Sequence, residues 1–73
     1  MTLMSQNQIF TTLNTEINRI RIMNIVPIAR NITDLADHIC KEFEFVGANN
    51  KPQIATCTAA LRSLDEKGLI EFA

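Results

Sequence analysis

Residues 54–72, IATCTAALRSLDEKGLIEF, carry the strongest structural signal in this chain. Apolar residues recur there at steps of three and four, at Ile54, Cys57, Leu61 and Leu64. This spacing places them on one face of a helix. Gly68 follows Lys67 where a helix C-cap belongs, because glycine adopts the left-handed conformation without a Cβ clash. Since Pro52 suits a first helical turn, we predict a helix over about 52–67 and a short strand over 69–72.

A second amphipathic helix is predicted immediately upstream. Thr33 is a good N-cap, and Asp34 and Asp37 place negative charge at the positive end of the helix dipole. Its apolar face comprises Leu35, Ala36, Ile39 and Phe43. The Gly47–Asn50 stretch then forms a loop, because glycine and asparagine tolerate left-handed backbone angles.

The N-terminal third reads as one more helix, from Ser5 to about Met23. Its apolar residues again follow steps of three and four, at Ile9, Phe10, Leu13, Ile17 and Ile20. Pro27 cannot easily continue this helix, because it lacks an amide hydrogen and restricts the residue before it. We therefore expect an extended connector with a short strand near 26–30.

The length allows one domain, residues 1–73, and a mainly α architecture of three helices. A chain this small buries only about 60% of its unfolded surface, which raises the expectation of a dimer. The formal net charge of -1 excludes the strongly basic composition that announces many nucleic-acid binders. Residues 34–46 are acidic on balance, whereas the segment through Thr33 is basic.

No pattern in the sequence points to catalysis. His38 lies beside acidic residues without a partner at triad or metal-ligand spacing. Cys40 and Cys57 are too few for a disulfide framework and are read as buried thiols, with a redox role unassigned. We predict no enzyme, no cofactor and no metal site. Without a charged N-terminal leader region or a long apolar run, the expected location is the cytoplasm, with no membrane partner.

Two segments together resemble the winged helix-turn-helix DNA-binding regulators, such as MarR-type repressors and small phage or plasmid regulators. ITDLADHI (32–39) is similar to the family's second helix, and TCTAALRSLDEKGLIEF (56–72) is similar to its recognition helix and following strand. The resemblance spans about residues 28–72. The 44–51 loop is longer than a tight helix-turn-helix turn, the sequence leaves no room for a full wing after residue 72, and Ala59 replaces a residue that is often basic.

The resemblance implies a small transcriptional regulator that binds double-stranded DNA through the 52–67 helix. The apolar area of the 5–23 helix, larger than one small core readily covers, predicts a dimer formed through that helix. The DNA-binding residues it implies are Arg30, Asn50, Lys51, Gln53, Thr56, Arg62 and Ser63. Amide side chains can pair with adenine, basic side chains with guanine or phosphate, and the Thr56 methyl with thymine. The alternative is a protein-interaction adaptor or anti-regulator that keeps the fold but does not bind DNA itself.

Overall fold

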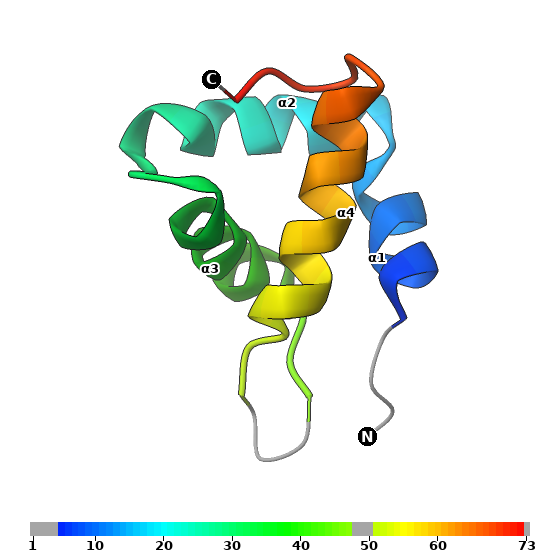
Figure 1. Ribbon diagram of the computed structural model, residues 1–73, viewed down its shortest axis with the longest axis vertical. Helices are drawn as coiled ribbons and strands as arrows, with labels where there is room; N and C mark the ends of the chain where they lie inside the picture. The colour runs from blue at the N-terminus through cyan, green and yellow to red at the C-terminus, as the bar shows by residue number, and fades with distance from the viewer. Residues whose placement is uncertain (1–4, 48–50, 73) are drawn as a thin grey trace.

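The computed structural model describes residues 5–47 and 51–72. It contains α1 (Gln6–Leu13), α2 (Glu16–Ile25), the short 3₁₀ helix η1 (Val26–Ile28), α3 (Ile32–Phe43) and α4 (Ile54–Glu66) (Figure 1). The mainly helical prediction is confirmed. Four α-helices replace the three that we expected, and neither predicted strand forms within the described ranges.

The single helix predicted over 5–23 is wrong, because the chain breaks between α1 and α2. The Thr15 side chain accepts a hydrogen bond from the Asn18 amide and so caps α2. Asn14 caps the end of α1, and its side-chain oxygen accepts a hydrogen bond from Arg19 at 2.7 Å. These short polar side chains compete with helical backbone bonding. The apolar steps of three and four continue across the break, so the spacing alone did not reveal it.

The strand expected near 26–30 is also wrong. Val26 to Ile28 form one 3₁₀ turn with Pro27 in its first turn, where the missing amide hydrogen has no cost. The Ala29 amide donates to the Val26 carbonyl at 3.2 Å. Proline therefore ends α2 by tightening the chain into a turn rather than by extending it.

Helix α3 begins two residues earlier than predicted, with Asn31 as its N-cap instead of Thr33. The Asn31 side chain accepts a hydrogen bond from the Asp34 amide at 2.8 Å. Asp34 in turn accepts from the Arg30 amide at 2.9 Å, which fixes the chain entering the helix. The helix ends at Phe43, and its C-cap Glu44 has a left-handed φ of 58°. The Glu44 and Phe45 amides both donate to the Cys40 carbonyl.

A narrow hairpin connects α3 to α4 and delays the start of α4 from Pro52 to Ile54. Val46 and Pro52 form an isolated antiparallel bridge, and the Gln53 amide donates to the Phe45 carbonyl at 3.0 Å. Gln53 is the N-cap residue of α4. The predicted loop is therefore real, but it takes up two residues that we had assigned to the helix.

The predicted C-terminal stop of α4 is confirmed at Gly68, which has a φ of 72°. The Leu69 amide donates to the Leu64 carbonyl, and the Gly68 amide donates to the Asp65 carbonyl. This is the Schellman arrangement, which satisfies the last helical carbonyls. The tail then folds back as an irregular segment: Ile70 is buried, and the Glu71 amide contacts the Met23 sulfur at 3.4 Å.

The core lies where α4 packs against α3 on one side and α1 on the other (Figure 1). Leu61 and Leu64, which we predicted to hold α4 in place, are both fully buried. The other fully buried large side chains are Ile9, Leu13, Ile22, Leu35, Ile39, Cys40 and Cys57. The mutual packing of these helices leaves one face of α4 and one face of α2 uncovered.

Candidate functional site

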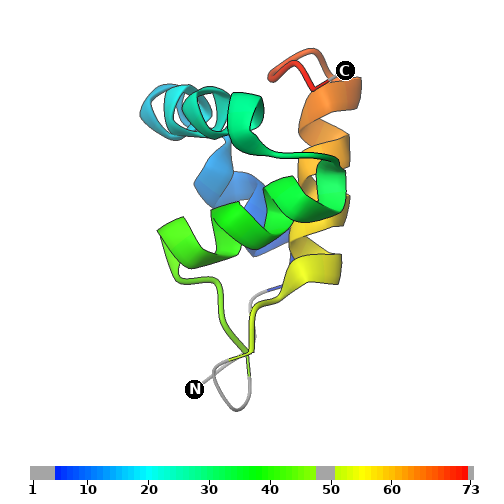
Figure 2. The same ribbon diagram turned by 90° about the vertical axis from the view of Figure 1, so that its left-hand side faces the viewer.

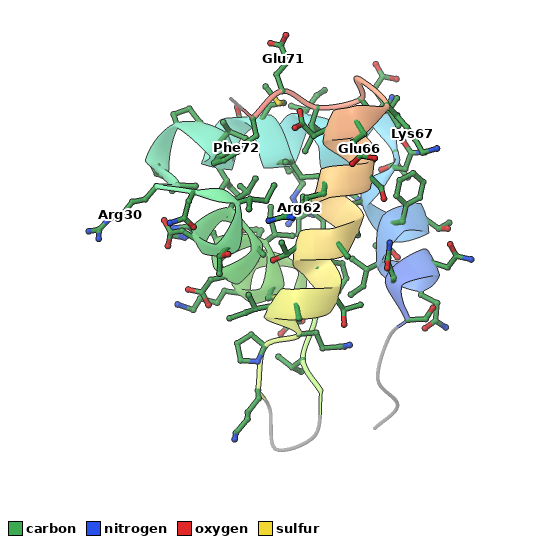
Figure 3. The ribbon with its side chains drawn as sticks, in the orientation of Figure 1. Arg30, Arg62, Glu66, Lys67, Glu71 and Phe72 are labelled. Carbon is green, nitrogen blue, oxygen red and sulfur yellow. The ribbon has the colours of Figure 1, made fainter. Side chains whose placement is uncertain are left out.

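The outward face of α4 carries the candidate site. Ala55, Ala59, Arg62 and Glu66 follow one another at steps of four, three and four, so they share one side of the helix. Ala59 is half-buried and the other three are exposed. Figure 3 shows Arg62 extending from α4 toward the side of the molecule on which Arg30 lies. This face is flat and nearly apolar in its first half and charged in its second.

A shallow hollow of about 600 Å³ borders this face where it meets the start of α3. Its lining residues are Thr33, Ile54, Ala55, Thr58, Ala59 and Arg62. A neighbouring hollow of about 430 Å³ shares Thr33 and Ile54 and adds Arg30 together with the carboxylates of Asp34 and Asp37. The two hollows thus join the N-terminal end of α3 to the exposed side of α4.

Three basic side chains near this surface are not engaged within the protein. Arg30, Lys51 and Arg62 are exposed, and none of their charged groups has a hydrogen bond, ion pair or ring contact within residues 5–47 and 51–72. By contrast, Arg21 pairs with Glu42 at 2.8 Å and lies over the Phe43 ring. The unengaged charges are therefore three of the residues that the resemblance implied for DNA contact.

The remaining predicted contacts are arranged differently. Thr56 and Ser63 are half-buried and share the side of α4 that holds buried Ala60. Ser63 lines a small hollow with Phe10 and Lys67, so this side is turned toward α1 rather than outward. Gln53 caps α4 and is half-buried, and Asn50 lies outside the described residues. The sequence placed Ala59 on the face opposite the apolar residues but did not identify Ala55 as part of the outward face, because this depends on where α1 packs.

The acidic face of α3 is largely satisfied within the protein. Lys41 pairs with Asp37 at 3.1 Å, and His38 lies 3.6 Å from Asp34. Asp34 also accepts the Arg30 amide. These contacts reduce, without removing, the negative field that an approaching phosphate would meet.

A second exposed surface lies on α2. Ile17 is 73% exposed and Ile20 is 56% exposed, and both point away from the buried side chain of Ile22. Met23 and Ile28 extend the exposed apolar surface toward η1. We had assigned the apolar residues of 5–23 to one dimerisation surface, but Ile9 and Leu13 are core residues and cannot contribute to it. Only the α2 part of that predicted surface is free.

The two cysteines lie in the same core. Hydrogen bonding from the Cys57 thiol, and to a lesser degree the nearby Gln53 backbone amide, favours the Cys40 thiolate and lowers the pKa of Cys40. The pKa of Cys57 is raised well above its ordinary value, mainly because its thiol donates a hydrogen bond to Cys40 and secondarily because it is buried. Both side chains are fully buried, as the sequence predicted.

Searches for related proteins and for special sites found nothing that assigns a function. No family model, curated protein or solved structure matches this chain. Within residues 5–47 and 51–72, no group of three or more His, Cys, Asp and Glu side chains is placed to hold a metal. In the same part of the chain, none of the helices has the length and apolar character to span a bilayer. The functional argument therefore rests on the chain's own surfaces.

Proposed function

We propose that this protein is a small cytoplasmic regulator, without enzymatic activity, that binds double-stranded DNA through the outward face of α4. One observation carries the proposal: the unengaged cations Arg30, Lys51 and Arg62 border the one uncovered face of a helix anchored on its other sides. A protein that binds DNA needs cations free to replace the counterions of the phosphates. Arg19, Arg21 and Lys41 are already bonded within the chain.

The outward face of α4 suits a major groove. Ala55 and Ala59 have short side chains, which allow the helix backbone to approach the base edges and contact a thymine methyl. Arg62 lies about two turns beyond Ala55 on the same face and can reach guanine or a phosphate. Lys51 precedes the helix N-terminus, which itself favours phosphate. In this proposal Ala55 and Ala59 take the place of Thr56, whose methyl we had expected to contact thymine, and Ser63 is no longer a contact residue.

A second copy of the chain is the proposed partner for the α2 face. An isologous contact requires a surface that complements itself under a two-fold axis. The exposed side chains of Ile17 and Ile20 provide apolar contact, while Arg19 and Arg21 are tied to Asn14 and Glu42. Two facing α2 helices would therefore bury apolar surface, with the Arg21 charge paired to Glu42 within each copy.

An adaptor that docks another protein is the alternative function. The hollow beside Arg62 favours it, because an apolar surface with one free guanidinium also suits an acidic peptide. The net charge of -1 gives this alternative further support. Binding to DNA and binding to an acidic peptide differ in how they respond to individual substitutions.

A fluorescence titration of random-sequence duplex at several salt concentrations tests the proposal. Arg62→Ala and Lys51→Ala should each weaken binding and reduce the salt slope by about one unit, as expected for a lost phosphate contact. Lys67→Ala is the matched control, because Lys67 ends the same helix but lies toward the α1 side, near the Phe10 ring (Figure 3). It should leave the slope unchanged.

Two results would contradict DNA binding. The first is parent protein that shows no salt-dependent association with duplex. The second is equal loss of affinity in the Lys67→Ala control, which would show that general charge and not the α4 face governs binding. If Arg62→Ala abolishes capture of an acidic peptide while duplex binding is absent, the adaptor function replaces the proposal.

A further inference from the structure

The hollow beside α4 offers apolar contact with one cation in its lining. Ile54, Ala55 and Ala59 contribute apolar side chains to that lining. Thr58 adds a methyl group, and its hydroxyl hydrogen is already donated to the Ile54 carbonyl at 2.7 Å. Among the described residues, none that lines this hollow has an amide or a carboxylate side chain. The hollow therefore lacks the side chains that read adenine or cytosine by hydrogen bonds.

We propose that this hollow recognises the C5 methyl group of a pyrimidine in the major groove, carried by thymine or by 5-methylcytosine. This preference rests on the proposed binding of duplex DNA and names the class of site that the α4 face takes. Thymine and 5-methylcytosine carry the same methyl group beside different hydrogen-bonding groups. A surface that reads the methyl group alone accepts both bases and discriminates against uracil and unmethylated cytosine.

The charges around the hollow favour DNA as the source of that methyl group. Arg62 lines the hollow itself, and Arg30 lines the adjoining one. Both guanidinium groups are exposed and unengaged within residues 5–47 and 51–72, so they can contact phosphates beside a groove. The carboxylates of the adjoining hollow have partners within the protein: Asp34 accepts the Arg30 amide, and Asp37 lies 3.1 Å from the Lys41 ammonium. An apolar surface flanked by cations matches a methyl group flanked by phosphates.

The spacing along α4 predicts which bases meet a helix that lies along the groove. Ala55 and Ala59 are four residues apart, or about 6 Å along the helix axis. Two base-pair steps span about 6.8 Å, so the two alanines match methyl groups two steps apart. Arg62 lies about 4.5 Å beyond Ala59 along the axis, near the next base pair, where a guanidinium can pair with guanine. The favoured pattern is therefore two methylated pyrimidines separated by one base and flanked by guanine.

Alternating duplexes test this preference without a known binding site. A repeat of guanine and thymine, paired with a repeat of adenine and cytosine, places a methyl group at every second position of one strand. Replacing each thymine with deoxyuridine removes the methyl groups and keeps the base pairs. In fluorescence titrations at one salt concentration, the thymine duplex should bind about four- to sixteenfold more tightly, since each methyl group removed from water contributes about fourfold.

A third duplex separates the methyl group from the rest of thymine. It keeps deoxyuridine in the first strand and carries 5-methylcytosine in place of cytosine in the second. The methyl groups return, again at every second position, but on a base with a different hydrogen-bonding edge. This duplex should bind at least about threefold more tightly than the uracil duplex, because most of the contribution of one methyl group is restored.

Ala55→Gln tests whether the α4 face makes the contact. Ala55 is exposed, so the substitution leaves the core intact, and the longer polar side chain should bring the ratio of thymine to uracil affinity close to one. The salt slope should stay unchanged, because no cation is removed. Thr11→Gln is the matched control, since it places the same side chain at an exposed position of α1, and it should keep the parent ratio.

The outcomes separate methyl recognition from DNA binding itself. Equal affinity for the thymine and uracil duplexes, with the salt slope retained, overturns methyl recognition and leaves the proposed function intact. Failure to bind any of the three duplexes in a salt-dependent manner overturns both. Methyl recognition is also overturned if the 5-methylcytosine duplex binds no better than the uracil duplex, or if Ala55→Gln keeps the parent ratio.

Discussion

Two helices in this protein end in a left-handed residue, but only one of those residues is glycine. Gly68 follows α4 with a φ of 72°, and Glu44 follows α3 with a φ of 58°. A Cβ added at Gly68 would meet nothing within 4 Å, so Gly68→Ala changes only the backbone preference. The reciprocal substitution, Glu44→Gly, relieves the strain that a side chain meets in this conformation. We therefore predict opposite effects on stability at two positions of similar geometry.

The magnitudes follow from two opposing contributions. A left-handed conformation costs a residue with a Cβ about 1–2 kcal/mol, while removing glycine from the unfolded chain returns about 0.4–1 kcal/mol. Gly68→Ala should therefore destabilise the protein by about 0.5–1 kcal/mol and lower the melting temperature by roughly 2–8 °C. Glu44→Gly should stabilise it by a similar amount. It also removes a negative charge from the negative end of the α3 dipole.

Thermal and urea unfolding followed by circular dichroism measure both effects. Glu44→Gln is the matched control, because it removes the charge but keeps the Cβ, and it should recover only a small part of the gain. The prediction fails if Gly68→Ala melts with the parent, since the strain argument would then be wrong at a site without steric contacts. It also fails if Glu44→Gly lowers the melting temperature.

Two further predictions concern the core and the α2 face. Leu64→Ala should cost about 2–5 kcal/mol, because the side chain is fully buried, and a parent-like urea midpoint would show that the α4 register is wrong. Ile20→Glu should convert the proposed dimer to a monomer in sedimentation equilibrium. Because the Ile20 side chain is exposed, the free energy of unfolding of the monomer should change by less than about 0.5 kcal/mol. Thr11→Glu, an exposed change on α1, is its control, and a parent that sediments as a monomer at high micromolar concentration would remove the dimer.

The sequence predicted α4 well because its signals agree with one another. The spacing of Cys57, Leu61 and Leu64 identified three fully buried side chains, and Gly68 marked the end of the helix correctly. The helix start was less accurate, since Pro52 is equally suited to a first helical turn and to the end of a hairpin. The local sequence pattern thus determined the buried face and the C-terminal end of α4. The bridge between Val46 and Pro52 determined where α4 begins.

The N-terminal region shows why periodicity alone was insufficient. Leu13 and Ile17 are four residues apart, as on one helical face, yet one is buried in α1 and the other is exposed on α2. Thr15 starts a new helix between them, and a capping bond depends on atomic geometry that apolar spacing does not contain. A helix break therefore turned half of the predicted surface into core.

The candidate site was predicted only in part, because sequence spacing does not show which helices pack beside α4. The charges on flexible stems, Arg30, Lys51 and Arg62, remain exposed whichever neighbour packs beside them. Thr56 and Ser63 have short side chains, so their environment follows from the position of α1, which sequence spacing does not specify. Long basic residues were thus easier to assign to a surface than short polar ones.

The positions of α2 and α4 decide how the two proposed surfaces can work together. Figure 2 shows α2 and α4 on opposite sides of the molecule. The α4 helix packs mainly against α3 and α1. A two-fold contact through α2 would therefore leave the two α4 faces pointing away from each other. One straight duplex cannot meet both faces, so each copy would engage its own duplex, and adjacent half-sites on one duplex would require a contact other than α2.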